Sequence, residues 1–279
     1  MSPTDDTDVV ARIDDAMRVW RQGDLALDET VFVHLADTDT PLTPAAREAG
    51  SGGLQTLQSA TTGLMVITQT CDLVRHCLNR PYVEVAPLVE LSEDEYRTVA
   101  RERIPSRATL HCLSAPRLAA DLDRSMTVEK AVVAEWARTP GCDDDAEMRR
   151  LAEALARKRS RFAFPDDFTK LAGPLRKRLL EKHGRRSEEG DALRELTEIR
   201  VAATPNWQAD RVTLLFWFVQ PAGSEHAVTP DRLEYLLGLM KPAGRYILVE
   251  GLIATLDDMS ATDYVASDRL ELDFLSAVS

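Results

Sequence analysis

The sequence predicts an α+β protein, because two different spacings of apolar residues occur in separate stretches. Apolar residues three and four positions apart predict helices, as over residues 9–20. Apolar residues in alternation or in short runs predict strands, as over residues 212–219. A chain of 279 residues that is 44% hydrophobic can form more than one core. We therefore expect three parts, over residues 1–122, 123–196 and 197–279.

The first part is expected to contain helices beside a small sheet. Two helices are predicted, over residues 9–20 and 92–102, and the second begins at Ser92 with Glu95 in the capping-box position. Strands are predicted over residues 24–35 (one or two short strands), 63–70, 82–91 and 108–113. Residues 36–62 are rich in Asp, Thr, Pro, Ser and Gly, which predicts a long loop with one helical turn at residues 44–48.

The second part is expected to be a helical module. A first helix is predicted over residues 127–137, and Asp143-Asp144-Asp145 opens a basic helix, since acidic residues suit the positive end of the helix dipole. Residues 162–168 interrupt it. A second basic helix then continues to Gly184, and a short helix follows over residues 187–195.

The third part is expected to be a β-β-α-β-β unit with an antiparallel sheet. Its strands are predicted over residues 199–203, 212–219, 246–256 and 270–274, with a helix over residues 230–240. We find no internal repeat and no low-complexity tract in the sequence.

Charge is strongly segregated along the chain. The net charge is −12, yet residues 148–187 contain thirteen Lys or Arg and only four Asp or Glu. Such segregation predicts a polyanionic partner, RNA or DNA, or an acidic protein, unless the chain's own acids neutralise the basic helices. Phe162, Phe164 and Phe168 lie between these helices and suit base stacking. The residues expected to contact nucleic acid are Arg150, Arg157, Lys158, Arg159, Arg161, Arg176, Lys177, Arg178, Lys182 and Arg185.

The segment Thr70-Cys71-Asp72 follows a predicted buried strand, with His76 one helical turn further on. A thiol near an imidazole suits a nucleophile and its base, so we take Thr70, Cys71, Asp72 and His76 as candidate catalytic residues. A neighbouring carboxylate, however, raises the pKa of a thiol and opposes its activation. The alternative is structural: Cys71 is a small buried residue and Asp72 caps the following turn.

Metal ligands of the right types are present in Cys71, His76, Cys77, His111 and Cys112, but their spacing is unfavourable. Cys71 and Cys77 are too far apart for a zinc knuckle, and adjacent His111 and Cys112 would point to opposite sides of a strand. We therefore predict no metal site and no cofactor. A polar, acidic start and the absence of a long apolar run exclude a signal peptide and a membrane partner, which predicts a cytoplasmic protein with reduced cysteines.

Three segments together resemble the PemK/MazF toxins. They are Gln22-Gly23-Asp24-Leu25-Ala26-Leu27, the apolar strand at residues 63–70, and the strand at residues 82–88 that contains Pro87. The resemblance covers about residues 20–115 and implies a small SH3-like β-barrel and RNA cleavage, with Thr70 at the position of the family's polar catalytic residue. The sequence differs from the family in having Thr61-Thr62 in place of a basic residue, Cys71-Asp72-Leu73 in place of an aromatic, Asn-containing segment, and a longer first connection.

These observations predict a nucleic-acid-binding component of a prokaryotic antiviral defence or toxin-like system, directed at RNA. Two other functions remain open: a cysteine-dependent hydrolase that uses Cys71, and a non-catalytic adaptor or dimerisation protein. The sequence does not decide whether the protein is an enzyme or forms a homo-oligomer.

Overall fold

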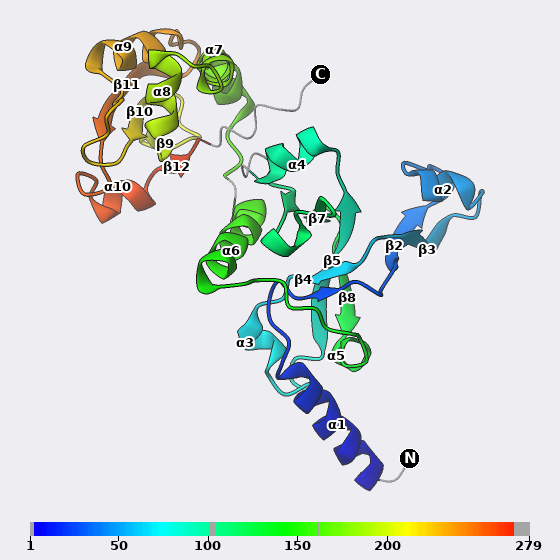
Figure 1. Ribbon diagram of the computed structural model, residues 1–279. Helices are drawn as coiled ribbons and strands as arrows, with labels where there is room; N and C mark the ends of the chain where they lie inside the picture. Colours follow the sequence, from blue (N-terminus) through cyan, green and yellow to red (C-terminus); the bar gives the residue numbers. More distant parts are fainter. Residues whose placement is uncertain (1–2, 101–103, 161, 271–279) are drawn as a thin grey trace. The chain divides into compact units, whose positions relative to one another are not determined.

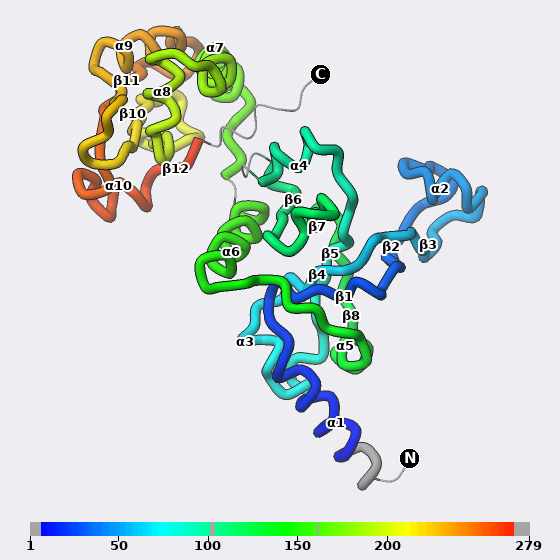
Figure 2. Tube along the Cα trace, viewed as in Figure 1, coloured from blue at the N-terminus to red at the C-terminus, as the bar shows by residue number. Residues whose placement is uncertain are grey.

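The computed structural model describes residues 3–100, 104–160 and 162–270, and it confirms a mixed α+β protein. The chain divides into two compact units, Met1–Ser160 and Arg161–Ser279 (Figure 1 and Figure 2). The boundary falls inside the stretch that was expected to form one helical module. The two basic helices, α6 (Asp145–Ser160) and α7 (Asp166–His183), therefore belong to different units.

The N-terminal unit contains a six-stranded antiparallel sheet in the order β1-β4-β5-β7-β6, with β8 also paired to β5. Its strands are β1 (Leu25–Ala26), β4 (Leu64–Val66), β5 (Tyr82–Glu90), β6 (Arg107–Ala108), β7 (Leu118–Asp121) and β8 (Met126–Glu129). Within the described residues no strand pair joins β1 to β6, so the sheet is not closed into a barrel.

Helices cover both faces of this sheet. The side chains of the central strand β5 point alternately to the two faces, so they contribute to two cores. Val83 and Val85 belong to one core, together with Met17 of α1 (Pro3–Met17). Leu88 belongs to the other core, together with Leu151 of α6. The short helices of this unit are α2 (Pro44–Glu48), α3 (Thr70–Leu73), α4 (Glu93–Ala100), α5 (Lys130–Val133) and the 3₁₀ turn His111–Leu113.

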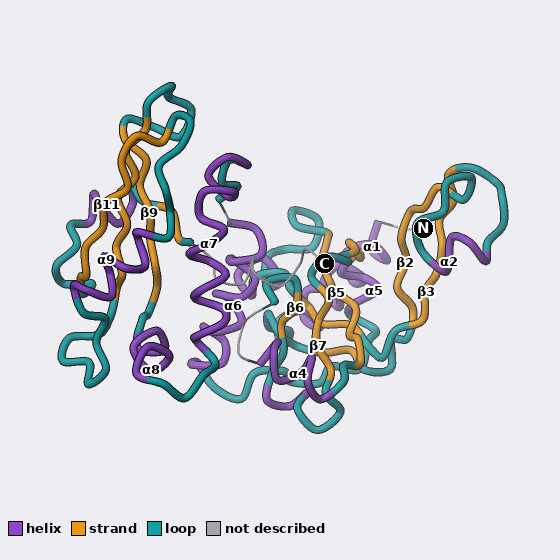
Figure 3. The backbone as a smooth tube through the Cα atoms, turned by 90° about the horizontal axis from the view of Figure 1, so that it is seen from above, coloured by secondary structure: helices purple, strands orange, loops and turns teal. Residues whose placement is uncertain are grey.

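Residues 36–62 form a hairpin rather than the predicted long loop, although the helical turn at α2 is confirmed. Strand β2 (Val31–Asp37) pairs with β3 (Leu54–Ala60) from Val31↔Ala60 to Asp37↔Leu54. The prediction was wrong because β3 is mostly polar, so its composition resembles that of a loop. In two perpendicular views the hairpin projects from the sheet (Figure 1 and Figure 3).

Two other predictions in this unit were wrong. Residues 127–137 contain β8 and the short α5 in place of one helix, because Val128 pairs with Val83 across the sheet. Residues 108–113 end β6 and then form a 3₁₀ turn, and the strand that follows, β7, was not predicted. In both places long-range strand pairing outweighs local preference.

The C-terminal unit is a four-stranded sheet in the order β11-β10-β9-β12. Its strands are β9 (Glu198–Thr204), β10 (Val212–Val219), β11 (Tyr246–Ala254) and β12 (Asp268–Arg269), and its other helices are α8 (Glu188–Glu195), α9 (Pro230–Gly238) and α10 (Ala261–Val265). The prediction of an antiparallel sheet was wrong for one pair, since β10 and β11 are parallel. The reason is that α9 connects them as a crossover, which returns the chain in the same direction. Most of the predicted strand at residues 270–274 lies outside the described residues.

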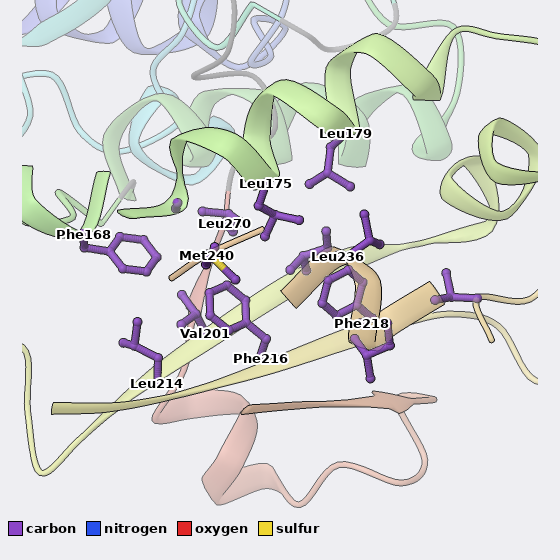
Figure 4. Close-up of a cluster of buried hydrophobic side chains, with 14 of the residues drawn as sticks. Phe168, Leu175, Leu179, Val201, Leu214, Phe216, Phe218, Leu236, Met240 and Leu270 are labelled. Carbon is purple, nitrogen blue, oxygen red and sulfur yellow. The ribbon is translucent and has the colours of Figure 1, made fainter. Parts of the chain in front are cut away.

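The larger core of the C-terminal unit lies between α7 and the sheet (Figure 4). Phe168, Leu175 and Leu179 of α7 point toward the sheet, where Phe216 and Phe218 of β10 meet them. Phe162 and Phe164 complete a ring cluster around Trp207, whose ring centroid lies 4.9 Å from that of Phe168. The three phenylalanines that were expected to stack on bases therefore pack inside this unit.

An ion pair at the start of α7 gives the C-terminal unit a pH-dependent contact. Arg245 donates to Asp167 through Nε at 2.7 Å and Nη2 at 2.9 Å, and the Tyr246 hydroxyl donates to the same carboxylate at 2.9 Å. Chiefly the Arg245 hydrogen bonds lower the pKa of Asp167 to about 2.

We expect the stabilisation from Asp167 to be full above about pH 4, the ordinary range of an unfolded Asp, and to disappear as the pH falls toward 2. The effect is small because the Asp167 side chain is half exposed. Arg245→Met should make the unfolding midpoint of the C-terminal unit less dependent on pH between those limits. Arg211→Met, on a nearby exposed arginine, is the control and should leave the dependence unchanged.

Candidate functional site

The Thr70 segment is held by the chain that enters β1. The Gly23 amide donates to Val66 O at 2.8 Å, and the Val66 amide donates to Asp24 O at the same distance. Gln22 then contacts the segment twice: its amide donates to Thr70 Oγ1 at 3.1 Å, and its side-chain Nε2 donates to Ile67 O at 2.9 Å. The Gly-Asp motif and the Thr70 segment, distant in sequence, thus form one structure.

Asp24 has a structural role in this arrangement. Its carboxylate is almost completely buried and accepts from Arg138 Nε at 2.6 Å, from the Arg21 amide at 2.6 Å and from the Gly141 amide at 3.3 Å. Gly23 beside it has a φ of +94°, and an added Cβ would lie 2.7 Å from Leu151 Cδ2. The turn therefore requires glycine, and the acid that follows anchors it.

Lys130 fixes the other end of the segment and was not predicted from the sequence. Its side chain is 1% exposed, and Nζ donates to Asp72 O at 2.9 Å and to Arg75 O at 2.7 Å. Burial lowers the pKa of this amine. These hydrogen bonds satisfy carbonyl groups at the end of the short helix α3, which begins at Thr70. No local pattern predicts these hydrogen bonds, because Lys130 lies more than fifty positions away along the chain.

The basic helix α6 reaches the sheet beside the Thr70 segment. Glu84 of β5 accepts from the Thr68 amide through its carbonyl at 3.3 Å and donates its own amide to Thr68 Oγ1 at 2.6 Å. The Glu84 carboxylate forms an ion pair with Arg159, and Lys158 pairs with Asp123. The cationic end of α6 is therefore joined to a residue that contacts Thr68, two positions before Thr70.

The other candidate catalytic residues have separate partners. Cys71 is exposed, not buried as the structural alternative expected, and its thiol contacts Gln69 Oε1 at 3.6 Å. The N-cap position of α3 is Gln69, and no side-chain hydrogen bond caps this helix. The Asp72 carboxylate instead lies near Arg80, with 3.9 Å between Oδ1 and Nε. His76 faces Asp14, with 3.7 Å between Nε2 and Oδ2. Within the described part of the chain no hydrogen bond or ion pair joins Cys71 to His76, so the structure shows no base that would activate this thiol.

The predicted nucleic-acid contacts differ in how far they are neutralised. In α7 the Arg178 guanidinium lies 2.7 Å from Glu189, Lys182 lies 4.0 Å from the same carboxylate, and Lys177 lies 4.0 Å from Glu181. The hydrogen bond to Glu189 raises the pKa of Arg178, whereas burial lowers that of Arg176. Much of the positive charge of α7 is thus balanced by its own unit.

The remaining predicted contacts are on or near the surface. Arg150 and Arg185 are exposed and make no ion pair with another described residue, and Arg157 is half-buried. Arg159 pairs with Glu84 but keeps a side chain that is 65% exposed. Arg161 lies outside the described residues. Among these predicted contacts, Arg159 of α6 is therefore the one that is joined, through Glu84, to the strand beside the Thr70 segment.

Of the five Cys and His residues considered as metal ligands, His76 and Cys77 lie close together, beside Asp14, and the other three lie apart from them. Cys112 donates its thiol to Gly141 O at 3.2 Å, and the neighbouring His111 amide donates to Glu147. Within the described ranges, no group of three metal-ligating side chains includes Cys71, His111 or Cys112.

Comparison of the chain with models of protein families, with curated proteins and with solved structures gives no match. None of the helices in the described residues has both the length and the apolar character needed to cross a membrane. The interpretation of the site therefore depends on its own geometry.

Proposed function

We propose that this protein binds nucleic acid, with RNA as its target, as part of a prokaryotic defence or toxin-like system. One observation carries the proposal: the cationic end of α6 lies at the strand that holds the Thr70 segment. Positive side chains beside a small polar turn are what phosphate binding needs. The PemK/MazF resemblance and an SH3-like relationship of the sheet are part of this proposal.

In this reading Arg150 and Arg159 contact backbone phosphates, and Thr70, Cys71 and Asp72 line the site. A phosphate would compete with Glu84 for Arg159, because both are anions that guanidinium groups bind in the same way. The net charge of −12 repels a polyanion, but at 0.15 M salt this repulsion is screened beyond about 8 Å. A local cationic surface on α6 can therefore still attract RNA.

Charge removal on α6 tests the proposal. We expect Arg150→Gln/Arg159→Gln to weaken binding of single-stranded RNA roughly tenfold, and to lower the slope of log affinity against log salt by about one to two. Fluorescence anisotropy with a labelled RNA, repeated at several salt concentrations, measures both quantities. Gln is chosen because it removes the charge, remains polar and does not add an acid beside Glu84.

Arg12→Gln/Arg18→Gln is the matched control, since Arg12 on α1 and Arg18 in the turn directly after it are both exposed arginines of the same unit. Equal losses in the two double variants, or wild-type binding that does not weaken with salt, would contradict the proposed interface. A Lys177→Gln/Arg185→Gln variant separately measures the contribution of the C-terminal unit.

The projecting hairpin supports the adaptor as a second candidate. Val31, Val33 and Leu35 follow one another on one face of β2, and their side chains are exposed. Leu54 at the far end of β3 is 71% exposed. Exposed apolar stripes of this kind are typical of protein-binding surfaces. A partner protein that binds through this hairpin, with no salt-dependent RNA binding, would favour the adaptor.

A further inference from the structure

Asp14 of α1 lies beside His76 and Cys77, which follow α3 in the chain. One carboxylate oxygen, one ring nitrogen and the thiol sulfur of these residues lie within 4.8 Å of one another. Oxygen, nitrogen and sulfur donors of this kind are the ligands of Zn²⁺ in proteins. We propose that Asp14, His76 and Cys77 bind one Zn²⁺ ion, with water at a fourth position. The proposal is independent of RNA binding.

The spacing of the donor atoms is close to that of a zinc site. Asp14 Oδ2 lies 3.7 Å from His76 Nε2. Two such ligands on tetrahedral zinc lie about 3.4 Å apart, as follows from metal–ligand distances near 2.1 Å. The Cys77 amide donates to Asp14 Oδ1 at 2.7 Å, which fixes the carboxylate and leaves Oδ2 directed at His76. The carboxylate and the ring therefore need only a small adjustment to share an ion, and the Cys77 sulfur lies within 4.8 Å of both.

Burial differs among the three ligands in a way that suits entry from one side. The Cys77 residue is 6% exposed and forms the inner wall, while the His76 side chain is 51% exposed and faces solvent. Burial, with a smaller contribution from Asp14, raises the pKa of the Cys77 thiol. Zinc binding forms a zinc–sulfur bond, breaks the S–H bond and releases that proton to water, so affinity increases with pH.

Two contacts reduce the affinity of this site. The buried Lys130 ammonium interacts with both Asp14 and Cys77, and its charge opposes a cation. The Leu78 amide donates to His76 Nδ1 at 3.3 Å, a long contact that zinc binding at Nε2 must break, because Nδ1 then carries the proton. The bond between zinc and the thiolate offsets these costs. Mg²⁺ and Ca²⁺ prefer oxygen ligands, and this site offers them only the carboxylate of Asp14. The proposal is therefore specific to thiolate-binding ions.

Such an ion would connect α1 to the end of the segment that begins at Thr70. Asp14 is on α1, and α3 ends three residues before His76. Zinc and Lys130 would then stabilise the same turn from two directions. The five residues considered as ligands from sequence included His76 and Cys77, but Asp14 is 62 positions away and no spacing rule identifies it.

The test is a titration of the full-length, metal-free protein with Co²⁺, whose thiolate charge-transfer absorption reports a bound cysteine. We expect one equivalent of Co²⁺ to bind, Zn²⁺ to displace it, and Mg²⁺ to have no effect. Asp14→Asn, His76→Gln and Cys77→Ser should each weaken binding by at least about tenfold, since even residues that only support a ligand contribute that much. Asn is used at position 14 because it can still accept from the Cys77 amide.

The matched controls are Asp15→Asn on the same helix, and Cys71→Ser and Cys112→Ser on the two exposed thiols. These variants should bind Co²⁺ as the wild type does. The proposal is overturned if the wild type gives no thiolate absorption, or if the absorption persists in Cys77→Ser and is lost in Cys71→Ser or Cys112→Ser. If circular dichroism shows that Asp14→Asn does not fold, the test depends on His76→Gln, because the His76 side chain is half exposed. Unchanged Co²⁺ affinity in His76→Gln then overturns the proposed site.

Discussion

Asp24→Ala is expected to destabilise the N-terminal unit by about 3–5 kcal/mol, the range found when one partner of a buried ion pair is removed. The change leaves the Arg138 guanidinium and the amides of Arg21 and Gly141 without their acceptor. It also loosens the turn that positions Gln22 against Thr70. Amide hydrogen exchange, read separately for peptides of residues 3–160 and 162–270, measures the loss.

Two further variants make this test specific. Asp15→Ala removes an exposed carboxylate that lies 3.5 Å from Arg18, and it should cost less than about 1 kcal/mol. Asp24→Asn, which keeps an acceptor but not the charge, should fall between the two. Loss of stability in Asp15→Ala equal to that in Asp24→Ala would show that the buried pair is not the anchor we describe.

Phe168→Ala is expected to destabilise the C-terminal unit by about 3–5 kcal/mol, since it leaves a cavity in a packed core. Phe168 is 1% exposed, and its ring lies 4.9 Å from both Phe164 and Trp207, measured between centroids. It also connects α7 to the sheet through Phe216 (Figure 4). Exchange in peptides of residues 162–270 should accelerate, while the N-terminal unit is unaffected.

Leu180→Ala is the control for Phe168, because Leu180 is on the same helix but 47% exposed. Its cost should be a small fraction of that for Phe168→Ala. If both variants were equally stable, or if Phe168→Ala lowered RNA affinity without changing exchange, the ring would have to be regarded as a surface residue. That result would restore the base-stacking role that the packing argues against.

Helices were predictable from the sequence where apolar residues repeat along a single face. In the second basic helix the apolar residues Phe168, Leu171, Leu175 and Leu179 repeat in this way, and α7 directs them into the core of the C-terminal unit. Strand β10 was predicted from its apolar run for a similar reason. In these elements the local pattern and the tertiary packing agree.

The elements that were missed depend on partners far away in the chain. Strand β3 is polar and is recognisable only through its pairing with β2, and β8 only through its pairing with β5. The parallel direction of β11 follows from the crossover through α9. The predicted order of elements already contained this helix between the two strands. Sequence spacing identifies neighbours along one element and gives no information on contacts between elements.

The same limit applies to the candidate site. Thr70 was predicted at the end of a buried strand, and the structure places it four positions after the last residue of β4, at the start of α3. Gln22, Lys130 and Glu84, which hold or adjoin that segment, lie 48, 58 and 16 positions from the residues they contact, so no local motif points to them. Cys71 and His76 were paired by their spacing, but the turn after α3 directs His76 to Asp14.

The enclosure of Lys130 has a consequence for chemical labelling. Amine-reactive reagents modify exposed lysines readily, but the Lys130 amine is covered by the fold and hydrogen-bonded to two carbonyls. Acylation at this position can proceed only when the N-terminal unit opens, so its rate measures that opening directly. Lys130 is thus a built-in reporter of local unfolding, readable by mass spectrometry without any mutation.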